Sequence, residues 1–283
     1  MVVNLHREDA LKSAGSASRW LLSHGAEVVA ESEVAEVLGV ESVETNLVSQ
    51  SDLVICFGGD GTLIRAAHLC SELGTPILGV YFGRFGFVTQ CTGDELGPAL
   101  SMVLDGTAQY DERMMLQTEL VRNGEPIAVM HSLNESVLQR SATHRMMVFG
   151  VHIDGIQVTR YPADGVMVAT PTGSTAYNLS AGGPIVDPTI QTLILTALAP
   201  HTLAARPLVL HPDSSIMLEV ETAGDAVLSV DGQTRLHLLS GDKVHITKSP
   251  RHTKLFSVAK NDFLEKLSSR LFYGITSPEV QEL

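Results

Sequence analysis

Short apolar runs alternate with helical spacing over roughly the first hundred residues. Leu53–Phe57 is apolar without interruption, as expected for a parallel strand buried on both faces, and Ile77–Phe82 and Met1–Leu5 are similar runs. Between these runs, apolar residues recur at helical spacing over Asp9–His24 and Thr62–Leu73. Such strand–helix alternation predicts a Rossmann-like layer, in which helices cover a parallel sheet.

The pattern changes near Asp105-Gly106. From Tyr110 to about Thr247, short alternating segments are separated by turn sequences, among them Asn123-Gly124, Asp154-Gly155 and Gly241-Asp242. This texture predicts a second, mostly β domain over residues 107–254. The first domain would then comprise residues 1–106 and a C-terminal return, about 255–283.

Helical spacing returns in the C-terminal segment. Phe263, Leu264, Leu267 and Leu271 fall on one helical face. We therefore expect a final helix that belongs to the first domain. The predicted fold class is a Rossmann-like α/β domain combined with a mostly β domain.

The charge and the cysteines narrow the function classes. The chain of 283 residues carries 19 Lys and Arg against 32 Asp and Glu, a formal net charge of −13. So acidic a chain argues against nucleic acid or an anionic membrane as partner. Cys56, Cys70 and Cys91 lack the spacing of a zinc site or of a redox pair. We expect buried, reduced thiols in a cytoplasmic protein, and the histidine spacings predict no firm protein ligands for a metal.

The stretch Val54–Leu69, VICFGGDGTLIRAAHL, places glycines between a strand and a helix. Glycines allow close approach of a ligand, and the first turn of a helix attracts anions. Asp60 lies within this turn, and two interpretations stand. It is either the N-cap of a tight turn, or a carboxylate that works beside Mg²⁺ and ATP.

Two further segments carry polar side chains in apolar surroundings. Asn134 and Glu135 stand together in a strand-like run, either as an exposed strand end or as contacts to a base edge and a ribose hydroxyl. Residues 164–188 combine hydroxyl side chains with Gly173 and Gly182-Gly183. That composition suits a close polar wrap around a nucleotide, although a Ser/Thr-rich loop would have the same composition.

Four elements in this order are similar to those of bacterial NAD kinases. They are GGDGT at 58–62, Asn134-Glu135, TPTGSTAYNLSAGGPI at 170–185 and PHTLAARPLV at 200–209. The resemblance implies transfer of the γ-phosphate of ATP to the 2′-hydroxyl of the adenosine ribose of NAD, with a divalent metal such as Mg²⁺. It also implies a homodimer or homotetramer that acts in NADP biosynthesis.

The resemblance assigns roles to individual residues. Asp60 would be the general base, with Gly58, Gly59 and Gly61 beside it, and Asn134 and Glu135 would hold the adenosine. The other positions it implies at the nucleotide site are Arg65, Arg145, Asp164, Thr175, Ala176, Tyr177, Asn178, Leu179, Ser180 and Gln233. Asp164 corresponds to an acidic residue near the nicotinamide, which can come from a neighbouring subunit.

One position departs from the family pattern. Pro162 stands two residues before Asp164, where many relatives carry a basic or small residue. Proline fixes the backbone and removes a donor. The departure leaves open NAD⁺ or NADH as acceptor and ATP or polyphosphate as donor.

Two other functions remain as alternatives. A lipid-type kinase would share the GGDGT element, but it predicts a membrane-facing surface and leaves residues 170–185 unexplained. A catalytically silent NAD(P)-binding sensor would bind nucleotide without turnover. Asp60 argues against the sensor, since a silent site has no use for a base.

Overall fold

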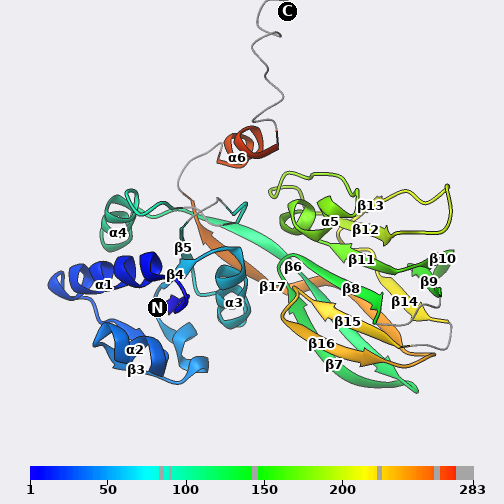
Figure 1. Cartoon of the computed structure of the whole chain (residues 1–283), viewed down its shortest axis with the longest axis horizontal. Coiled ribbons are helices and arrows are strands. Elements are labelled where there is room, and N and C mark those ends of the chain that lie inside the picture. Colours follow the sequence, from blue (N-terminus) through cyan, green and yellow to red (C-terminus); the bar gives the residue numbers. More distant parts are fainter. Residues whose placement is uncertain (83–85, 89–90, 142–145, 222–224, 258–261, 272–283) are drawn as a thin grey trace, which may run out of the picture. The chain divides into compact units, whose positions relative to one another are not determined.

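The computed structural model describes residues 1–82, 86–88, 91–141, 146–221, 225–257 and 262–271 (Figure 1). The chain forms two compact units. The first contains residues 1–111 and 254–283, and the second contains residues 112–253. The boundaries fall within two long strands, β6 (Tyr110–Arg122) and β17 (Lys243–Phe256).

The first unit is built on parallel strands. The strands β1 (Val2–Val3), β4 (Val54–Gly58) and β5 (Ile77–Tyr81) pair in that order, and the end of β17 pairs with β5. All residues of β4 and β5 are buried, so the uninterrupted apolar runs were correctly interpreted as strands covered on both faces. A short parallel pair, β2 (Val29–Ala30) and β3 (Glu41–Ser42), lies apart from this sheet.

Helices cover both faces of these strands. Figure 1 shows α1 (Glu8–Ser23) and α3 (Asp60–Cys70) on opposite sides of β4 and β5. The buried face of α1 consists mainly of Ala10, Ala14, Ala17 and Leu21. Small side chains at this spacing let the helix approach the sheet closely. The helix predicted over Asp9–His24 is present, with both bounds one residue earlier. Among the described residues of this unit, the other helical segments are α2 (Ser32–Leu38), the 3₁₀ turn η1 (Thr45–Gln50), α4 (Leu96–Leu104) and α6 (Asp262–Leu271).

The second unit contains a six-stranded antiparallel sheet and the antiparallel strands of the nine-stranded sheet to which β1, β4 and β5 also belong. The six-stranded sheet has the order β13 (Leu208–Leu210), β12 (Leu193–Leu198), β11 (Gly165–Ala169), β8 (Glu135–Arg140), β15 (Ala226–Val230) and β16 (Thr234–Leu238). In the other, β17 pairs with β14 (Ile216–Val220), which pairs with β9 (Met147–Ile153), and β9 pairs with β10 (Ile156–Ala163). β7 (Glu125–Ser132) pairs with β6.

Side chains from both sheets form one core, in which Leu138, Val166 and Leu228 meet Phe149 and Leu218. The predicted turns at Asn123-Gly124, Asp154-Gly155 and Gly241-Asp242 are all present, each with a positive φ at glycine. The fold class predicted from the sequence is therefore confirmed. Within the described residues, no helix combines the length and the apolar character needed to cross a membrane.

Candidate functional site

The GGDGT element joins β4 to α3. The carbonyl of Gly59 accepts the first helical hydrogen bonds, from the N–H groups of Thr62 (3.0 Å) and Leu63 (3.1 Å). Gly59 is therefore the N-cap, and Asp60 is already the first residue of the helix. The interpretation of Asp60 as an N-cap was wrong, and the helix begins two residues earlier than Thr62.

The carboxylate of Asp60 lies against a neighbouring loop. Its Oδ2 accepts a hydrogen bond from the backbone N–H of Phe87 at 3.1 Å. A Cβ added to Gly86 would lie 1.6 Å from Oδ1, so only glycine fits there. The side chain is therefore held in place from outside its own helix, at the N-terminal end of α3, where the helix dipole favours anions.

The glycines of the element differ in their reasons for being glycine. A Cβ on Gly58 would lie 2.3 Å from Oγ1 of Thr62, so the fold itself requires that residue. Gly59 and Gly61 have no positive φ, and among the described residues nothing lies within 4 Å of a Cβ built on either. Their backbones border open space beside Asp60, which suits a bulky anion such as a phosphate chain.

Arg65 is one turn further along α3 and faces another segment. Its guanidinium forms an ion pair with the carboxylate of Glu31, which also accepts a hydrogen bond from Oγ1 of Thr45 at 2.7 Å. Arg65 therefore links α3 to the β2–α2 segment. Its predicted contact with a nucleotide stays a prediction.

In the second unit, Asn134 and Glu135 stand at the beginning of β8, as the strand-end interpretation expected. They are 5% and 8% exposed, so the interpretation as an exposed strand end was right about the strand end and wrong about the exposure. Within the described residues, Oδ1 of Asn134 and Oε2 of Glu135 have no hydrogen-bond partner. An unsatisfied buried polar atom costs roughly 1–3 kcal/mol, so these two oxygens indicate a ligand with hydrogen-bond donors.

Burial changes the proton affinity of Glu135. Its pKa is raised from 4.5 to about 8, mainly because burial disfavours the charged form and secondly because Asp231 is negatively charged. A hydrogen bond from the backbone N–H of Tyr177 acts in the opposite direction. Near neutral pH the carboxyl group therefore holds its proton in a substantial fraction of molecules, and can both donate and accept.

The segment after β11 wraps around this pair. The backbone N–H of Thr170 donates to the carbonyl of Asn134 (2.8 Å), and its Oγ1 donates to the carbonyl of Leu133 (2.6 Å). A Cβ on Gly173 would lie 2.1 Å from the carbonyl oxygen of Asn134. The hydroxyl and the glycine thus serve close packing of the chain on itself, which the composition alone did not distinguish from contact with a nucleotide.

Asn178 has a structural part in the same segment. It is fully buried, and its Nδ2 donates to the carbonyls of Ser174 (3.2 Å) and Pro184 (3.1 Å), while Oδ1 accepts from Oγ1 of Thr196 (2.8 Å). Its amide therefore fixes the loop that holds the helical turn α5 (Tyr177–Ser180). A contact between Asn178 and a nucleotide stays a prediction.

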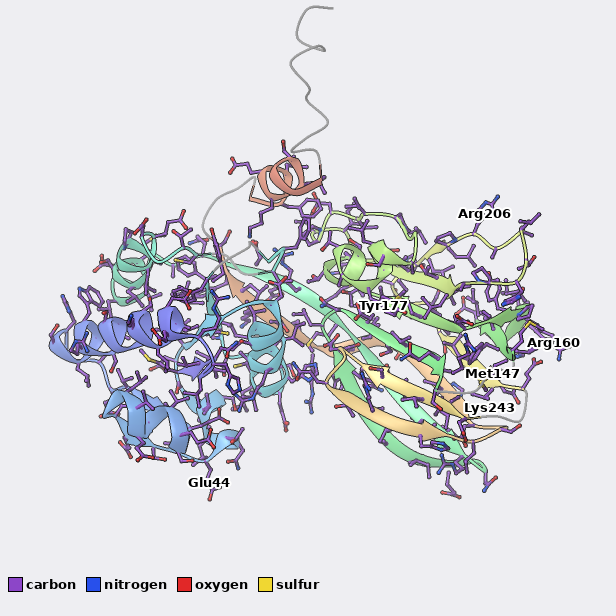
Figure 2. The ribbon with its side chains drawn as sticks, in the orientation of Figure 1. Glu44, Met147, Arg160, Tyr177, Arg206 and Lys243 are labelled. Carbon is purple, nitrogen blue, oxygen red and sulfur yellow. The ribbon has the colours of Figure 1, made fainter. Side chains whose placement is uncertain are left out.

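The residues around Asn178 are more accessible. Tyr177, labelled in Figure 2, and Ser180 are exposed, whereas Thr175, Ala176 and Leu179 are half-buried. Thr175 ends the 3₁₀ turn η2 (Thr172–Thr175). The backbone N–H of Tyr177 reaches Glu135. This segment therefore borders the carboxyl group of Glu135 directly.

Comparison with known proteins agrees with both units. Residues 1–108 match the ATP-NAD kinase N-terminal domain, and residues 133–258 match the ATP-NAD kinase C-terminal domain. An NAD kinase from Caldanaerobacter subterraneus is 39% identical over 275 residues, which cover 96% of this chain and 97% of that protein. The chain belongs to the ATP-NAD kinase family.

Other members extend the comparison. An NAD kinase from Geobacter sulfurreducens is 39% identical over 90% of this chain and 91% of its own. Among solved structures, yeast NADH kinase complexed with NADH has a TM-score of 0.89 and 26% identity, and covers 95% of this chain and 85% of its own. An Archaeoglobus fulgidus NAD kinase in complex with ATP has a TM-score of 0.68 and 26% identity, over 84% and 92%. The fold is thus that of the ATP-NAD kinases.

Three other residues implied by the family resemblance are Asp164, Gln233 and Arg145. Asp164 precedes β11 and forms an ion pair with Arg140 at 2.8 Å. Gly165 pairs with Gln139 and Ala169 with Glu135, so four residues of strand, about 14 Å, separate the two ends. Gln233 is exposed in the turn after β15, and Arg145 lies outside the described residues. Glu135 begins β8, and Asp164 contacts Arg140 at the other end of that strand.

Sequence reasoning missed Asp231. Of this part of the predicted β domain, only Gln233 was named from the sequence. The structure places a turn at Asp231-Gly232, where both residues have positive φ. The dipeptide Asp-Gly between alternating runs is a hairpin signal that could have marked this turn. The carboxylate of Asp231 accepts hydrogen bonds from the backbone N–H groups of Asn134 and Glu135.

Proposed function

We propose that the chain is an NAD kinase that transfers the γ-phosphate of ATP to the 2′-hydroxyl of the adenosine ribose of NAD, giving NADP and ADP. Family membership supports this, as do the likenesses to a kinase complexed with NADH and to another in complex with ATP. The observation that carries the proposal is the pair of buried oxygens on Asn134 and Glu135 without partners. A nucleoside supplies the donors that such oxygens require.

The donor side of the reaction is assigned to the first unit. Gly58, Gly59 and Gly61 would hold the phosphate chain of ATP at the N-terminal end of α3. The oxygen of the 2′-hydroxyl would bond to the γ-phosphorus, and the bond between the γ-phosphorus and the oxygen that bridges it to the β-phosphate would break. Asp60 would accept the proton of that hydroxyl. Mg²⁺ bound with ATP would offset the charge that the phosphates place beside the carboxylate. Arg65 of this unit and Arg145, which belongs to the second unit and lies outside the described residues, are proposed as cations that contact the nucleotides.

The acceptor side is assigned to the second unit. Asn134 and Glu135 would bind the adenosine, and Thr175–Ser180 would border the rest of the molecule. Asp164, at the far end of β8 from Glu135, would lie near the nicotinamide, in the same subunit or in a neighbouring one. Gln233 is proposed as an additional contact.

We infer that the chain forms a homodimer or homotetramer. The strand β10 exposes the apolar side chains of Ile156 and Val158, and apolar side chains gathered on a surface often mark an interface. Light scattering of the purified protein at micromolar concentration should give two or four times the 30.3 kDa chain mass. A mass near that of one chain at all concentrations would exclude this assembly. We assign the enzyme to the cytoplasm, where buried free thiols such as Cys56 persist.

A coupled assay tests the proposed reaction. Purified protein is incubated with NAD⁺, ATP and Mg²⁺, and NADP⁺ is followed with an NADP-specific dehydrogenase. We expect NADP⁺ only when protein, metal and phosphate donor are all present. Parallel reactions with NADH or with polyphosphate decide which acceptor and donor are used, a choice that Pro162 leaves open.

The silent sensor gives a different result in the same experiment. It predicts no NADP⁺ in any reaction, together with NAD binding that calorimetry detects. Absence of both product and binding would refute the proposal and the sensor alike.

A further inference from the structure

The carboxylate of Asp231 binds the backbone of the turn between β7 and β8. Oδ2 of Asp231 accepts a hydrogen bond from the backbone N–H of Leu133 at 2.7 Å. Oδ1 accepts two, from the N–H groups of Asn134 (2.8 Å) and Glu135 (3.0 Å). Asp231 also donates its own N–H to the carbonyl of Glu135 at 3.0 Å. One side chain, only 8% exposed, thus binds three successive amides.

The opposite groups of the same turn are fixed by another segment. The carbonyls of Leu133 and Asn134 accept hydrogen bonds from Thr170, and Gly173 packs against Asn134 without room for a Cβ. The backbone of the turn is therefore clamped by Asp231 through its N–H groups and by Thr170 through its carbonyls. Among the residues that the structure describes, the side-chain oxygen of Asn134 and one oxygen of Glu135 have no hydrogen-bond partner.

The use of a charged residue here has a cost that a plain turn would avoid. Asp231 is buried beside a second carboxyl group, and two neighbouring negative charges disfavour each other. Asparagine would close an ordinary hairpin of this kind equally well. Three hydrogen bonds to a carboxylate, however, are shorter and about twice as strong as bonds to a neutral acceptor. The carboxylate therefore provides rigidity at the place where the unpaired oxygens are displayed.

We propose that Asp231 is a positioning residue for the bound nucleotide, because it fixes the backbone of Asn134 and Glu135 so that their unpaired oxygens face the donors of the adenosine moiety. This inference rests on the proposed function, since it assigns the nucleotide to that pair. It adds a residue that makes no contact with the nucleotide itself and acts through its two neighbours.

The charge of Asp231 provides a second readout. Burial is the larger cause of the raised pKa of Glu135, and Asp231 is the charged group that adds to it. Removing that charge lowers the pKa of Glu135, so the inflection in the pH dependence of NAD affinity moves to lower pH. A buried aspartate of another turn, which is not among the causes of the raised pKa of Glu135, would not move it.

The test compares Asp231→Asn with Asp242→Asn as a matched control. Asp242 is a buried aspartate of another turn in the same unit, where it accepts hydrogen bonds from Arg122 (2.7 and 2.9 Å) and from the N–H of Leu239 (2.8 Å). Both variants lose one buried carboxylate, and both are expected to melt at lower temperature. Steady-state constants are measured where circular dichroism shows each variant folded, and the Kd for NAD is measured by calorimetry.

In Asp231→Asn we expect KM and Kd for NAD to rise roughly tenfold or more, because a donor now faces the N–H of Leu133. KM for ATP and kcat should stay within about threefold. The pH inflection should move to lower pH. Asp242→Asn should keep the wild-type KM for NAD and the wild-type inflection. Asp231→Glu, which keeps the charge but displaces it, should weaken NAD binding while the inflection stays where the wild type has it.

Equal NAD affinity in wild type and Asp231→Asn would overturn the inference, and so would an equal loss in both asparagine variants. These results differ from failure of the proposed function, in which the wild type makes no NADP⁺. If the wild type binds NAD without turnover, the Kd comparison still decides the role of Asp231. If it binds no NAD, the inference fails with the proposal.

Discussion

Replacing Asp60 with asparagine is expected to lower turnover by roughly 10²- to 10⁴-fold, the range for loss of one general base. Asparagine has the same shape and keeps an acceptor for the N–H of Phe87, so the loop at Gly86 should stay in place. It cannot take a proton from the 2′-hydroxyl. NAD binding should therefore be largely retained, as measured by calorimetry beside the coupled assay.

Asp52→Asn is the matched control for this variant. Asp52 is an exposed aspartate of the same unit, at the opposite end of β4 from Gly58, and its replacement removes the same charge. It should leave turnover at the wild-type level. Turnover within about tenfold of wild type in Asp60→Asn would remove Asp60 from the role of base.

Replacing Glu135 with glutamine is expected to remove a large part of the pH dependence of stability. The folded chain holds a proton on Glu135 up to about pH 8, whereas the unfolded chain releases it near pH 4.5, because burial and then Asp231 raise the pKa. Between these values the native state binds more protons than the unfolded state, so stability falls as pH rises. The contribution is fully present below pH 4.5 and is lost as pH rises through about 8.

The size of this effect follows from the shift. Each pKa unit corresponds to about 1.4 kcal/mol, so the loss across the window is on the order of 3–5 kcal/mol. Urea unfolding of the free protein at pH 5.5 and pH 8.5 measures it. The wild type should lose several kcal/mol between the two pH values, and Glu135→Gln should lose much less, as glutamine does not titrate.

Glu125→Gln serves as the control, because Glu125 is an exposed glutamate at the start of β7 in the same unit. The free energy of unfolding of this variant should fall between pH 5.5 and pH 8.5 by the same amount as that of the wild type. An identical pH dependence of the free energy of unfolding in the wild type and Glu135→Gln would contradict the account. It would show that burial does not raise the pKa of Glu135 in the folded chain.

Local pattern was enough to predict the two textures of the chain. The apolar run before Gly58 has no polar position, and this predicts a strand covered on both faces whatever lies around it. Asn-Gly and Asp-Gly turns are equally local, since they require only a left-handed backbone at two residues. Helical spacing likewise placed the last helix at Phe263–Leu271 before its neighbours were known.

The parts that sequence could not predict depend on contacts between distant segments. Nothing in the sequence near Asn178 indicates that its amide accepts a hydrogen bond from Thr196. Likewise, nothing near Arg65 indicates that its guanidinium forms an ion pair with Glu31. The burial of Glu135 also depends on strands far along the chain. Such pairings arise from tertiary packing, and the sequence records them only through the fold.

Asp231 shows the same limit at the candidate site. In sequence it stands almost a hundred residues from Glu135, between two short alternating runs. Only the pairing of β15 with β8 brings its carboxylate to the amides of Leu133 and Asn134. The family resemblance identified Gln233 in the same turn, but residues that act through a neighbour leave no motif of their own.

The most direct test of the central claim is the position of the transferred phosphate. The protein is incubated with NAD⁺, Mg²⁺ and ATP that carries a labelled γ-phosphate, and the dinucleotide product is cleaved at its pyrophosphate. We predict that the label is recovered in adenosine 2′,5′-bisphosphate, and that Asp60→Asn forms this product far more slowly than Asp52→Asn. Label that stays in ATP or appears only as inorganic phosphate, with a folded protein that binds NAD, would contradict the account.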